Sequence, residues 1–298
     1  MDRIICKCRG REIRENDLAI IREIIVKYFS IGRKRISQEL SKHWQWYQPN
    51  GQLKDMACRE ILLRLERTGY IKLPPGRHNG NNQRRNRETT DQIPLPKNTK
   101  EELLQGTLKN FLPVELKLIK DRKNQSLWNA LISRYHYQGY HGIVGACLKY
   151  LCYWQGKVIA CLGWGSAAWN VECRDKYIGW SKEVKDKKLP FIVNNIRFLI
   201  LPGVKVKYLA SHLLSLSVKQ VPEDWQKQYG HSIYLLETFV EKERFRGTCY
   251  KAANWIYVGE TKGYSKRGSS HYQHRNIKDV YVYLLCRDFR GKLMGQGI

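Results

Sequence analysis

Two carboxylates of this chain have the chemistry to support phosphodiester cleavage. Glu237 sits within the apolar run 233–240, where an unpaired carboxylate is expensive, and Asp175 lies earlier in the chain. Converging carboxylates hold Mg²⁺ and polarise a scissile phosphate in two-metal reactions. The structural alternative is that each carboxylate forms a buried ion pair with Arg174 or Arg197, and such pairs are the commoner outcome. Sequence separation does not decide between the two.

Tyr250 is a second candidate for chemistry, as a covalent nucleophile. Arg246, Lys251 and Asn254 lie close to it in sequence, and cations can stabilise the charge that develops when a hydroxyl attacks a phosphodiester. The alternative is that Tyr250 packs at the start of a helix with its hydroxyl bonded to a backbone group. The chain contains 18 tyrosines, so a catalytic role for any single one needs support from geometry.

The charge of the chain favours a polyanion as its partner. There are 53 Lys and Arg residues against 27 Asp and Glu residues, a formal net charge of +26. Nucleic acid is the expected ligand class, with a solvated basic surface as the alternative. An anionic membrane is not expected, because no apolar run is long enough to span one. Nine cysteines, an odd number spread over the whole chain, indicate a reducing compartment, and we expect a cytoplasmic protein.

Residues 1–75 are predicted to form a winged helix-turn-helix-like DNA-binding domain. Apolar residues recur at helical spacing in 17–29 and 53–69, with a shorter helix beginning at Ser37. Residues 70–75 are interpreted as a short β-ribbon that forms the wing. Such a unit offers its third helix to the major groove of DNA. The alternative is a small helical bundle with a solvated basic face. The cations predicted to make these contacts are Lys54, Arg59 and Arg64.

Residues 76–100 are predicted to be a basic linker, and residues 101–298 a mixed α/β core domain. The linker has no apolar periodicity, and its Arg84 and Arg85 are predicted to follow a phosphate backbone as a flexible arm, with a plain tether as the alternative. In the core we expect helices within 113–135, then strands and helices in alternation. The expected strands include a hairpin turning at 155–157, the runs 197–205, 233–240 and 255–259, and a last strand at 278–287.

Further cations and polar residues of the core are predicted to contact DNA. Residues 263–271 have the composition of a loop that orders on phosphates, with a disordered surface loop as the alternative. Residues 135–141 alternate aromatic residues with histidines, which suits stacking on unpaired bases or covering a sheet edge. The predicted DNA contacts of the core are Arg197, Arg244, Arg246, Lys251, Asn254, Lys266 and Arg267.

Several phrases of the chain, in one order, closely resemble the DruA family. They are 178–180 (IGW), 194–202 (NNIRFLILP), 209–212 (LASH), 236–240 (LETFV) and 246–255 (RGTCYKAANW). DruA is a component of the Druantia anti-phage system, and its relatives also occur beside or within transposable elements. The resemblance implies bacterial phage defence or mobile-element biology acting on DNA, with other proteins of such a system as partners.

The predicted order of elements in the core is similar to an N-acetyltransferase fold of the GNAT type. In that family a Gly-rich turn after the central strand binds the pyrophosphate of coenzyme A through backbone N–H groups. Here the corresponding turn, residues 201–207, reads LPGVKVK and lacks the expected glycine spacing. We therefore expect a GNAT-like topology without acetyltransferase activity.

These observations lead to an α/β protein with two functional alternatives. In the first, the winged helix and the basic core hold DNA while partner proteins perform the chemistry, and no cofactor is needed. In the second, the chain is itself a DNA-cleaving or strand-transfer enzyme, resembling a transposase or nuclease, with Asp175 and Glu237 holding Mg²⁺ or Tyr250 attacking DNA. The second alternative needs a convergent site, which only the fold can reveal.

Overall fold

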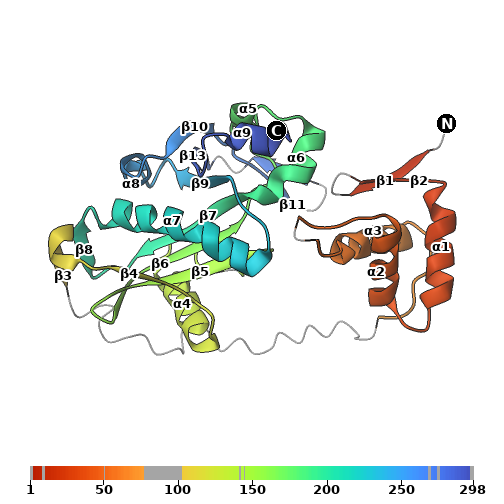
Figure 1. The fold of residues 1–298 in the computed structure, drawn as a ribbon, viewed down its shortest axis with the longest axis horizontal. Coiled ribbons are helices and arrows are strands. Elements are labelled where there is room, and N and C mark those ends of the chain that lie inside the picture. Colours follow the sequence, from red (N-terminus) through yellow and green to blue (C-terminus); the bar gives the residue numbers. More distant parts are fainter. Residues whose placement is uncertain are drawn as a thin grey trace. The chain divides into compact units, whose positions relative to one another are not determined.

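The computed structural model describes residues 3–8, 11–49, 51–76, 103–140, 142–143, 145–267, 270–273 and 276–295. The chain divides into two compact units, Met1–Asn86 and Arg87–Ile298 (Figure 1). Each unit has a hydrophobic core of its own, and the two are described separately.

The N-terminal unit packs three helices and a β-hairpin around one core. The hairpin pairs β1 (Ile4–Cys8) with β2 (Arg11–Arg14), and the helices are α1 (Asp17–Tyr28), α2 (Arg33–His43) and α3 (Asp55–Arg67). Each helix buries one apolar face, as the helical spacing predicts. The buried residues of α3, for example, are Ala57, Cys58, Ile61, Leu62 and Leu65.

The β-ribbon expected at residues 70–75 is not formed, and this prediction is wrong. The segment forms no strand and lies against the helices instead. Glu66 of α3 accepts a hydrogen bond from the backbone N–H of Leu73 (3.2 Å), and Arg33 of α2 donates to the carbonyl oxygen of Pro74 (2.6 Å). Pro74 and Pro75 have no backbone N–H with which to extend a ladder. The hairpin of this unit therefore precedes the three helices.

The C-terminal unit is built on a seven-stranded sheet in the order β10-β13-β9-β7-β6-β5-β4. All neighbours are antiparallel except β7 and β9, which are parallel. The strands are β4 (Glu115–Leu118), β5 (Cys147–Trp154), β6 (Lys157–Ser166), β7 (Ile192–Ile200), β9 (Leu235–Glu241), β10 (Ile256–Glu260) and β13 (Lys278–Leu284). Smaller two-stranded sheets pair β3 (Leu104–Thr107) with β8 (Val204–Lys207), and β11 (Tyr264–Arg267) with β12 (Ser270–Gln273). The mixed α/β sheet predicted from the sequence is confirmed.

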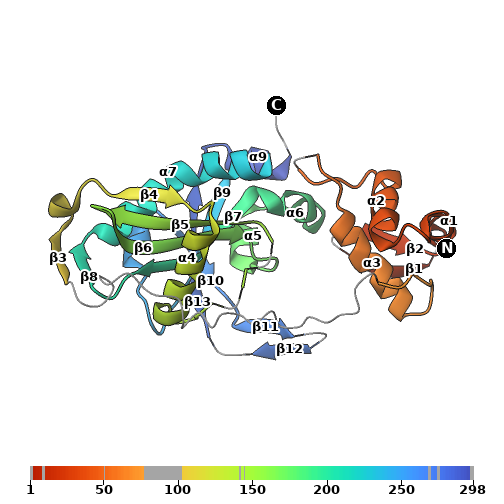
Figure 2. The ribbon, with the colours of Figure 1, turned by 90° about the horizontal axis from the view of Figure 1, so that it is seen from below.

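Helices cover both faces of this sheet. Helix α4 (Arg122–Tyr135) packs Trp128 and Leu131 on one face, and Figure 2 shows it lying across β5 and β6. The long helix α7 (Leu209–Tyr229) covers the other face. Four shorter helices complete the unit: α5 (Glu172–Ile178), α6 (Lys182–Lys188), α8 (Thr248–Ala252) and α9 (Phe289–Met294). The inward and outward alternation along β5 produces these two apolar layers.

Two local predictions for this unit had different outcomes. Gln155 and Gly156 both have positive φ, at 46° and 74°, which is the geometry of the tight hairpin turn expected between β5 and β6. The helical interpretation of 113–135 is wrong for its first part, because Glu115–Leu118 form β4, whose side chains alternate in exposure and which pairs with β5. The helix begins after Asp121, whose carboxylate accepts a 2.8 Å hydrogen bond from the N–H of Asn124.

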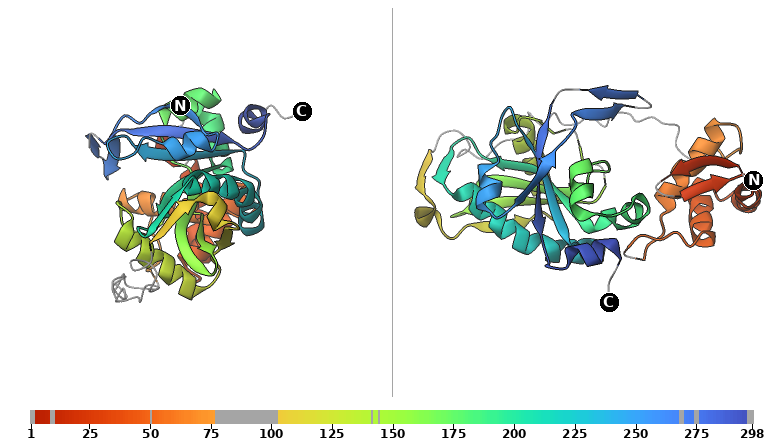
Figure 3. Two further views of the ribbon diagram at one scale, coloured as in Figure 1. Left: turned by 90° about the vertical axis from the view of Figure 1, so that its left-hand side faces the viewer. Right: turned by 90° about the horizontal axis from the view of Figure 1, so that it is seen from above.

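The two halves of the sheet diverge between β7 and β9. These strands pair only from Ile192↔Leu235 to Asn195↔Thr238, although β7 continues to Ile200 and β9 to Glu241. The left view of Figure 3 shows β9, β13 and β10 turning away from β4–β7. Beyond the last pair no backbone ladder joins the two strands, and side chains occupy the space between them. This divergence positions the site described next.

Candidate functional site

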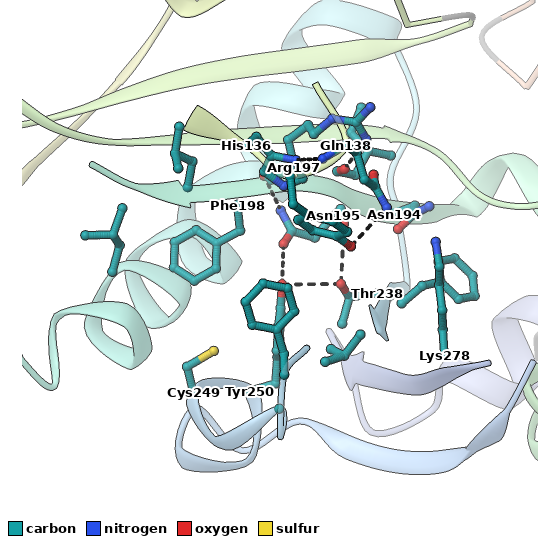
Figure 4. Close-up of a pocket in the computed structure, with 18 of the residues that line it drawn as sticks. His136, Gln138, Asn194, Asn195, Arg197, Phe198, Thr238, Cys249, Tyr250 and Lys278 are labelled. Carbon is teal, nitrogen blue, oxygen red and sulfur yellow. Dashed lines mark hydrogen bonds between the residues drawn. The ribbon is translucent and has the colours of Figure 1, made fainter. Parts of the chain in front are cut away.

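A cavity of about 580 Å³ opens where β7 and β9 separate, and we call it the β7–β9 cavity. Its walls come from the divergent parts of both strands, the segment that follows α4, the loop between β9 and α8, and the start of β13 (Figure 4). The lining residues with polar side chains are His136, Gln138, Asn194, Asn195, Arg197, Thr238, Arg246, Thr248, Tyr250 and Lys278, together with Tyr135, Tyr137 and Cys249.

A buried hydrogen-bond network ties the two strands together at the point where pairing ends. The Tyr250 hydroxyl donates to Oδ1 of Asn195 over 2.7 Å, and the Thr238 hydroxyl lies 3.3 Å from both the Tyr250 hydroxyl and the Asn195 carbonyl oxygen. The amide group of Asn195 donates to the carbonyl oxygen of Gly163 on β6 (3.1 Å). Burial raises the pKa of the Tyr250 hydroxyl above its ordinary value. Tyr250 is therefore a neutral phenol whose proton is already engaged.

The cavity is cationic. Arg197, Arg246 and Lys278 line it, and its described lining includes no Asp or Glu residue. Burial lowers the pKa of the Arg197 guanidinium and the pKa of the Lys278 ammonium. The negative charge of Glu241 opposes this effect on the pKa of Lys278, and the positive charge of Arg197 adds to it. Concentrated positive charge with aromatic walls is a site that favours an anion.

Two polar atoms of the lining are buried without a hydrogen-bond partner. They are Oδ1 of Asn194, a residue only 9% exposed, and Nε of Arg197, whose Nη1 donates to the carbonyl oxygen of Ile196 (2.7 Å). A buried acceptor or donor left without a partner costs about 1–3 kcal/mol, and native structures contain few of them. Two residues of the cavity lining thus leave one buried acceptor and one buried donor unpaired.

Aromatic residues form one rim of the cavity. The rings of His136 and Tyr137 stack at 4.8 Å between centroids, and the Tyr137 ring lies 5.4 Å from that of Phe245. The guanidinium of Arg244 sits 5.3 Å from the centre of the Tyr137 ring. Burial, with the charge of Arg197, lowers the pKa of His136 to about 4, so its imidazole is neutral at neutral pH.

Gly247 brings the loop between β9 and α8 close to the cavity. Its φ is +66°, in the left-handed region, and a Cβ built on it would lie 2.6 Å from the hydroxyl oxygen of Tyr281 on β13. Only glycine accommodates both the conformation and this close approach. The neighbouring Arg246 and Thr248 are thereby held in the cavity wall.

The structure shows Asp175 and Glu237 as partners of one arginine. Glu237, on β9, is fully buried and accepts 2.7 Å hydrogen bonds from Nη1 of Arg174 and from the N–H of Ala168. Asp175 accepts from Nη2 of Arg174 (2.8 Å) and from Lys185 and Trp180. Burial opposes the charge on Arg174, but the two carboxylates outweigh it and raise its pKa.

The structure thus shows the ion-pair alternative, with Arg174 and not Arg197 as the partner. The guanidinium occupies the space between the two carboxylates, and neither carboxylate belongs to the lining of the β7–β9 cavity. Among the described residues, no group of three or more His, Cys, Asp or Glu side chains is placed to hold a metal ion.

Of the predicted DNA contacts that the structure describes, Arg197 and Arg246 line the cavity. Arg244 lies at its rim on Tyr137, whereas Lys251 and Asn254 lie on the exposed side of α8 and its end, where Asn254 has φ +62°. Lys266 and Arg267 are on β11. Arg84 and Arg85 lie outside the described residues.

On α3, two of the three predicted contacts are held by acidic side chains of the same helix. Arg64 pairs with Glu60 (2.6 Å) and Arg59 with Asp55 (3.7 Å), both with i,i+4 spacing. The third, Lys54, precedes the helix, with its ammonium 5.9 Å from the centre of the Trp46 ring. Exposed pairs of this kind contribute about 0–1 kcal/mol, so they exchange for other partners at little cost.

The sequence-based prediction missed Asn194, Thr238 and Lys278. One signal was available, since two adjacent asparagines inside the apolar strand 192–200 are unusual and need hydrogen-bond partners. Lys278 gave no such signal, because its place in the cavity depends on the pairing of β13 with β9.

Comparison with known proteins places the chain in a family. The family model described as Druantia protein DruA matches residues 64–283, which is most of the chain. The chain belongs to the DruA family. The match confirms the resemblance seen in the sequence phrases. It includes β7, β9 and α8, and so most of the wall of the cavity. No curated protein matches this DruA-family chain.

Solved acetyltransferases are similar to parts of the DruA-family chain at low scores. A crystal structure of aminoglycoside acetyltransferase AAC(6')-Ib with coenzyme A has 15% identity and a TM-score of 0.37, covering 60% of this chain and 98% of that one. A Bacillus subtilis acetyltransferase in complex with coenzyme A has 6% identity and a TM-score of 0.38, covering 58% and 99%. An N-acetyltransferase from Staphylococcus aureus Mu50 has 13% identity and a TM-score of 0.34, covering 58% and 97%. These values carry no conclusion about activity.

The turn that follows β7 is used structurally. Within residues 201–207, Val204–Lys207 form β8, which pairs in parallel with β3 through Leu104↔Val204 and the three residues that follow. The backbone of β8 is therefore engaged in a ladder.

None of the described helices combines the length and apolarity needed to cross a bilayer.

Proposed function

We propose that this DruA-family chain is the DNA-binding component of a Druantia-type phage-defence or mobile-element system. In this proposal the C-terminal unit holds DNA at the β7–β9 cavity and its rim. The observation that carries the proposal is the lining itself: Arg197, Arg246 and Lys278 converge on one cavity whose described lining has no carboxylate. The net charge of +26 supports a polyanionic partner, and membership of the family supports a defence role.

The physical basis is the release of counterions from the phosphate backbone. Each cation that neutralises a phosphate releases condensed counterions, so binding weakens steeply as salt rises. Arg244 on the rim and Lys251 on α8 are exposed and extend the positive surface outward from the cavity. A strand that passes over this rim would place its phosphates against these side chains.

The N-terminal unit is proposed as a second, weaker DNA contact. Its α3 presents Arg59 and Arg64, and this role rests on the three-helix arrangement without a wing at residues 70–75. Phosphates would have to replace Asp55 and Glu60 as their partners, an exchange that costs little at an exposed surface. The core is therefore the principal site in this proposal.

The alternative of a DNA-cutting enzyme has no specific observation in its favour. The Mg²⁺ site on Asp175 and Glu237 and the nucleophilic role of Tyr250 stay predictions. In the structure Arg174 lies between the carboxylates, and the Tyr250 hydroxyl is engaged by Asn195. Both groups have a complete structural role without a reaction.

Fluorescence anisotropy of a labelled duplex against the full chain tests DNA binding. We expect the affinity to fall steeply from 50 to 200 mM salt, and Arg246→Gln and Lys278→Gln each to weaken binding and to lower the slope of log K against log salt by about 1. Lys227→Gln is the matched control, since it removes the same charge from the exposed end of α7. Affinity that does not change with salt would overturn the proposal.

A further inference from the structure

We propose that the β7–β9 cavity takes one unpaired nucleotide out of the DNA, with its base inside and its phosphate at the mouth. This inference rests on the proposed function and specifies it: the preferred substrate is DNA with an extrahelical or single-stranded nucleotide. Four properties of the cavity lead to it, namely its size, its apolar walls, its unpartnered polar atoms and the place of its cations.

The cavity has the size of a small-molecule site. Its volume of about 580 Å³ lies within the range of roughly 300–1,000 Å³ that encloses small ligands. A duplex about 20 Å across cannot enter such a hollow, because groove recognition needs a protruding helix or ribbon. A single base with its sugar, swung out of the stack, is the part of DNA that a cavity of this kind accepts.

The walls include flat aromatic rings on which a base can stack. Phe245 is on the loop that closes the cavity and is 49% exposed, and the ring of Tyr137 lies 5.4 Å from it. Phe198 of β7 also lines the cavity, and its ring packs against that of Tyr250 at 6.4 Å. Stacking of a base on aromatic rings tolerates any sequence and adds substantially to affinity.

The unpartnered atoms of the lining suit the edge of a base. Asn194 Oδ1 is an acceptor and Arg197 Nε is a donor, and both are buried without a partner in the lining of the same cavity. Base edges present donors and acceptors that amide and guanidinium groups recognise. In this inference both side chains turn toward a bound base and pair with its edge, which a phosphate alone would not do for the Asn194 oxygen.

The cations are placed for the phosphates that flank such a base. Lys278 lines the cavity at the start of β13, and Arg246 is on the exposed part of the loop before α8. The neighbouring carboxylates pair with other cations: Glu241 lies 3.6 Å from Arg244, and Asp279 lies 3.9 Å from Lys242. A nucleotide that enters between Lys278 and Arg246 would bring its negative charge to both side chains.

Three labelled DNAs test this inference with the full chain in anisotropy titrations. They are a duplex, the same duplex with one extrahelical nucleotide, and that bulged duplex with an abasic site at the extrahelical position. The last two have the same number of phosphates and the same bend-inducing bulge. We expect the bulged duplex to bind about tenfold more tightly than its abasic counterpart, because only the former supplies a base to stack.

Two variants assign the difference to the cavity. Phe245→Ala, at a half-exposed loop position, and Asn194→Ala, which removes an oxygen that has no partner, should each reduce the tenfold preference to about twofold or less. Lys227→Ala, on the exposed end of α7, should leave both the preference and the affinity for each DNA unchanged within twofold.

The outcomes separate this inference from the proposed function. Equal affinity for the bulged and abasic duplexes, with salt-dependent duplex binding intact, overturns the inference alone. Loss of binding to all three DNAs overturns the proposed function as well. Free nucleoside monophosphates provide a further arm: if they bind with a dependence on Phe245 while none of the DNAs does, the cavity takes a free nucleotide and the DNA source is wrong.

Discussion

The hydroxyl of Tyr250 donates a 2.7 Å hydrogen bond to Oδ1 of Asn195, and this bond joins helix α8 to strand β7 across the base of the β7–β9 cavity. Thr238 of β9 belongs to the same network, so side chains connect β7 and β9 at the place where the backbone ladder stops. The bond makes Tyr250 a positioning residue in the structure, and this role differs measurably from that of a nucleophile.

Substitution of Tyr250 by Phe should lower stability without any effect on chemistry. The oxygen of Asn195 would remain buried without its donor, which costs about 1–3 kcal/mol. Urea unfolding would measure the loss, with Tyr257→Phe on exposed β10 as the control. A covalent protein–DNA adduct formed by the original chain and absent from Tyr250→Phe would contradict this view and restore the nucleophile.

Glu237→Ala and Arg174→Ala should each destabilise the C-terminal unit strongly. Both residues are fully buried, and removal of one partner leaves the other charge uncompensated, at a cost of about 3–5 kcal/mol. Glu223→Ala, which breaks an exposed pair with Lys227, should change stability by less than about 1 kcal/mol. If Glu237→Ala proved as stable as the control, the carboxylate would not have the structural role assigned to it.

Gly247→Ala should destabilise the protein more than Gly179→Ala. Both glycines have positive φ, +66° and +86°, so each alanine carries about 1–2 kcal/mol of backbone strain. At Gly179 the new methyl group meets nothing within 4 Å, whereas at Gly247 it meets the buried Tyr281. The difference between the two unfolding free energies measures the close approach, and equal values would show that the loop shifts freely. DNA affinity should fall in Gly247→Ala and stay unchanged in Gly179→Ala, because Gly247 holds the neighbouring Arg246 in the cavity wall.

Stability should decline as the pH falls from about 6.5 to about 4, in part because of His136. Its pKa is lowered to about 4 in the folded chain from an ordinary value of 6.5, so the unfolded chain binds a proton in this window and the folded chain does not. The stability associated with neutral His136 is therefore complete above pH 6.5 and is lost as the pH approaches 4.

Urea unfolding of His136→Gln at pH 7.5 and 5.0 checks this contribution. The variant should lose less stability between these pH values than the original chain does. His43→Gln, at an exposed position of α2, is the comparison and should follow the original chain. A His136→Gln profile that coincides with the His43→Gln profile would show that the surroundings of His136 do not exclude the proton.

The sequence predicted the α/β architecture well where apolar patterns are long. The strand that contains Glu237 was expected, and the buried ion pair of Glu237 with Arg174 was one of the two stated alternatives. Local patterns failed where tertiary partners decide, as at residues 70–75, which Arg33 and Glu66 hold away from a ladder.

The cavity was beyond the reach of sequence patterns because it arises from missing strand pairs. No residue pattern in β7 indicates that its ladder with β9 stops at Asn195. Lys278 reaches the cavity only through the register of β13 on β9, in which it lies opposite Glu241. Residue types identified Arg197 and Arg246 as cations of interest, but their convergence is a property of the fold.

The divergence of β7 and β9 has a consequence for how the family can change. Because the hollow is framed by backbone, it persists when the side chains inside it are exchanged. Replacement of Phe245 or Asn194 would alter what the hollow accepts while the apolar layers beneath α4 and α7 stay as they are. A chain with this fold can thus acquire a new binding preference by a few substitutions while its scaffold stays the same.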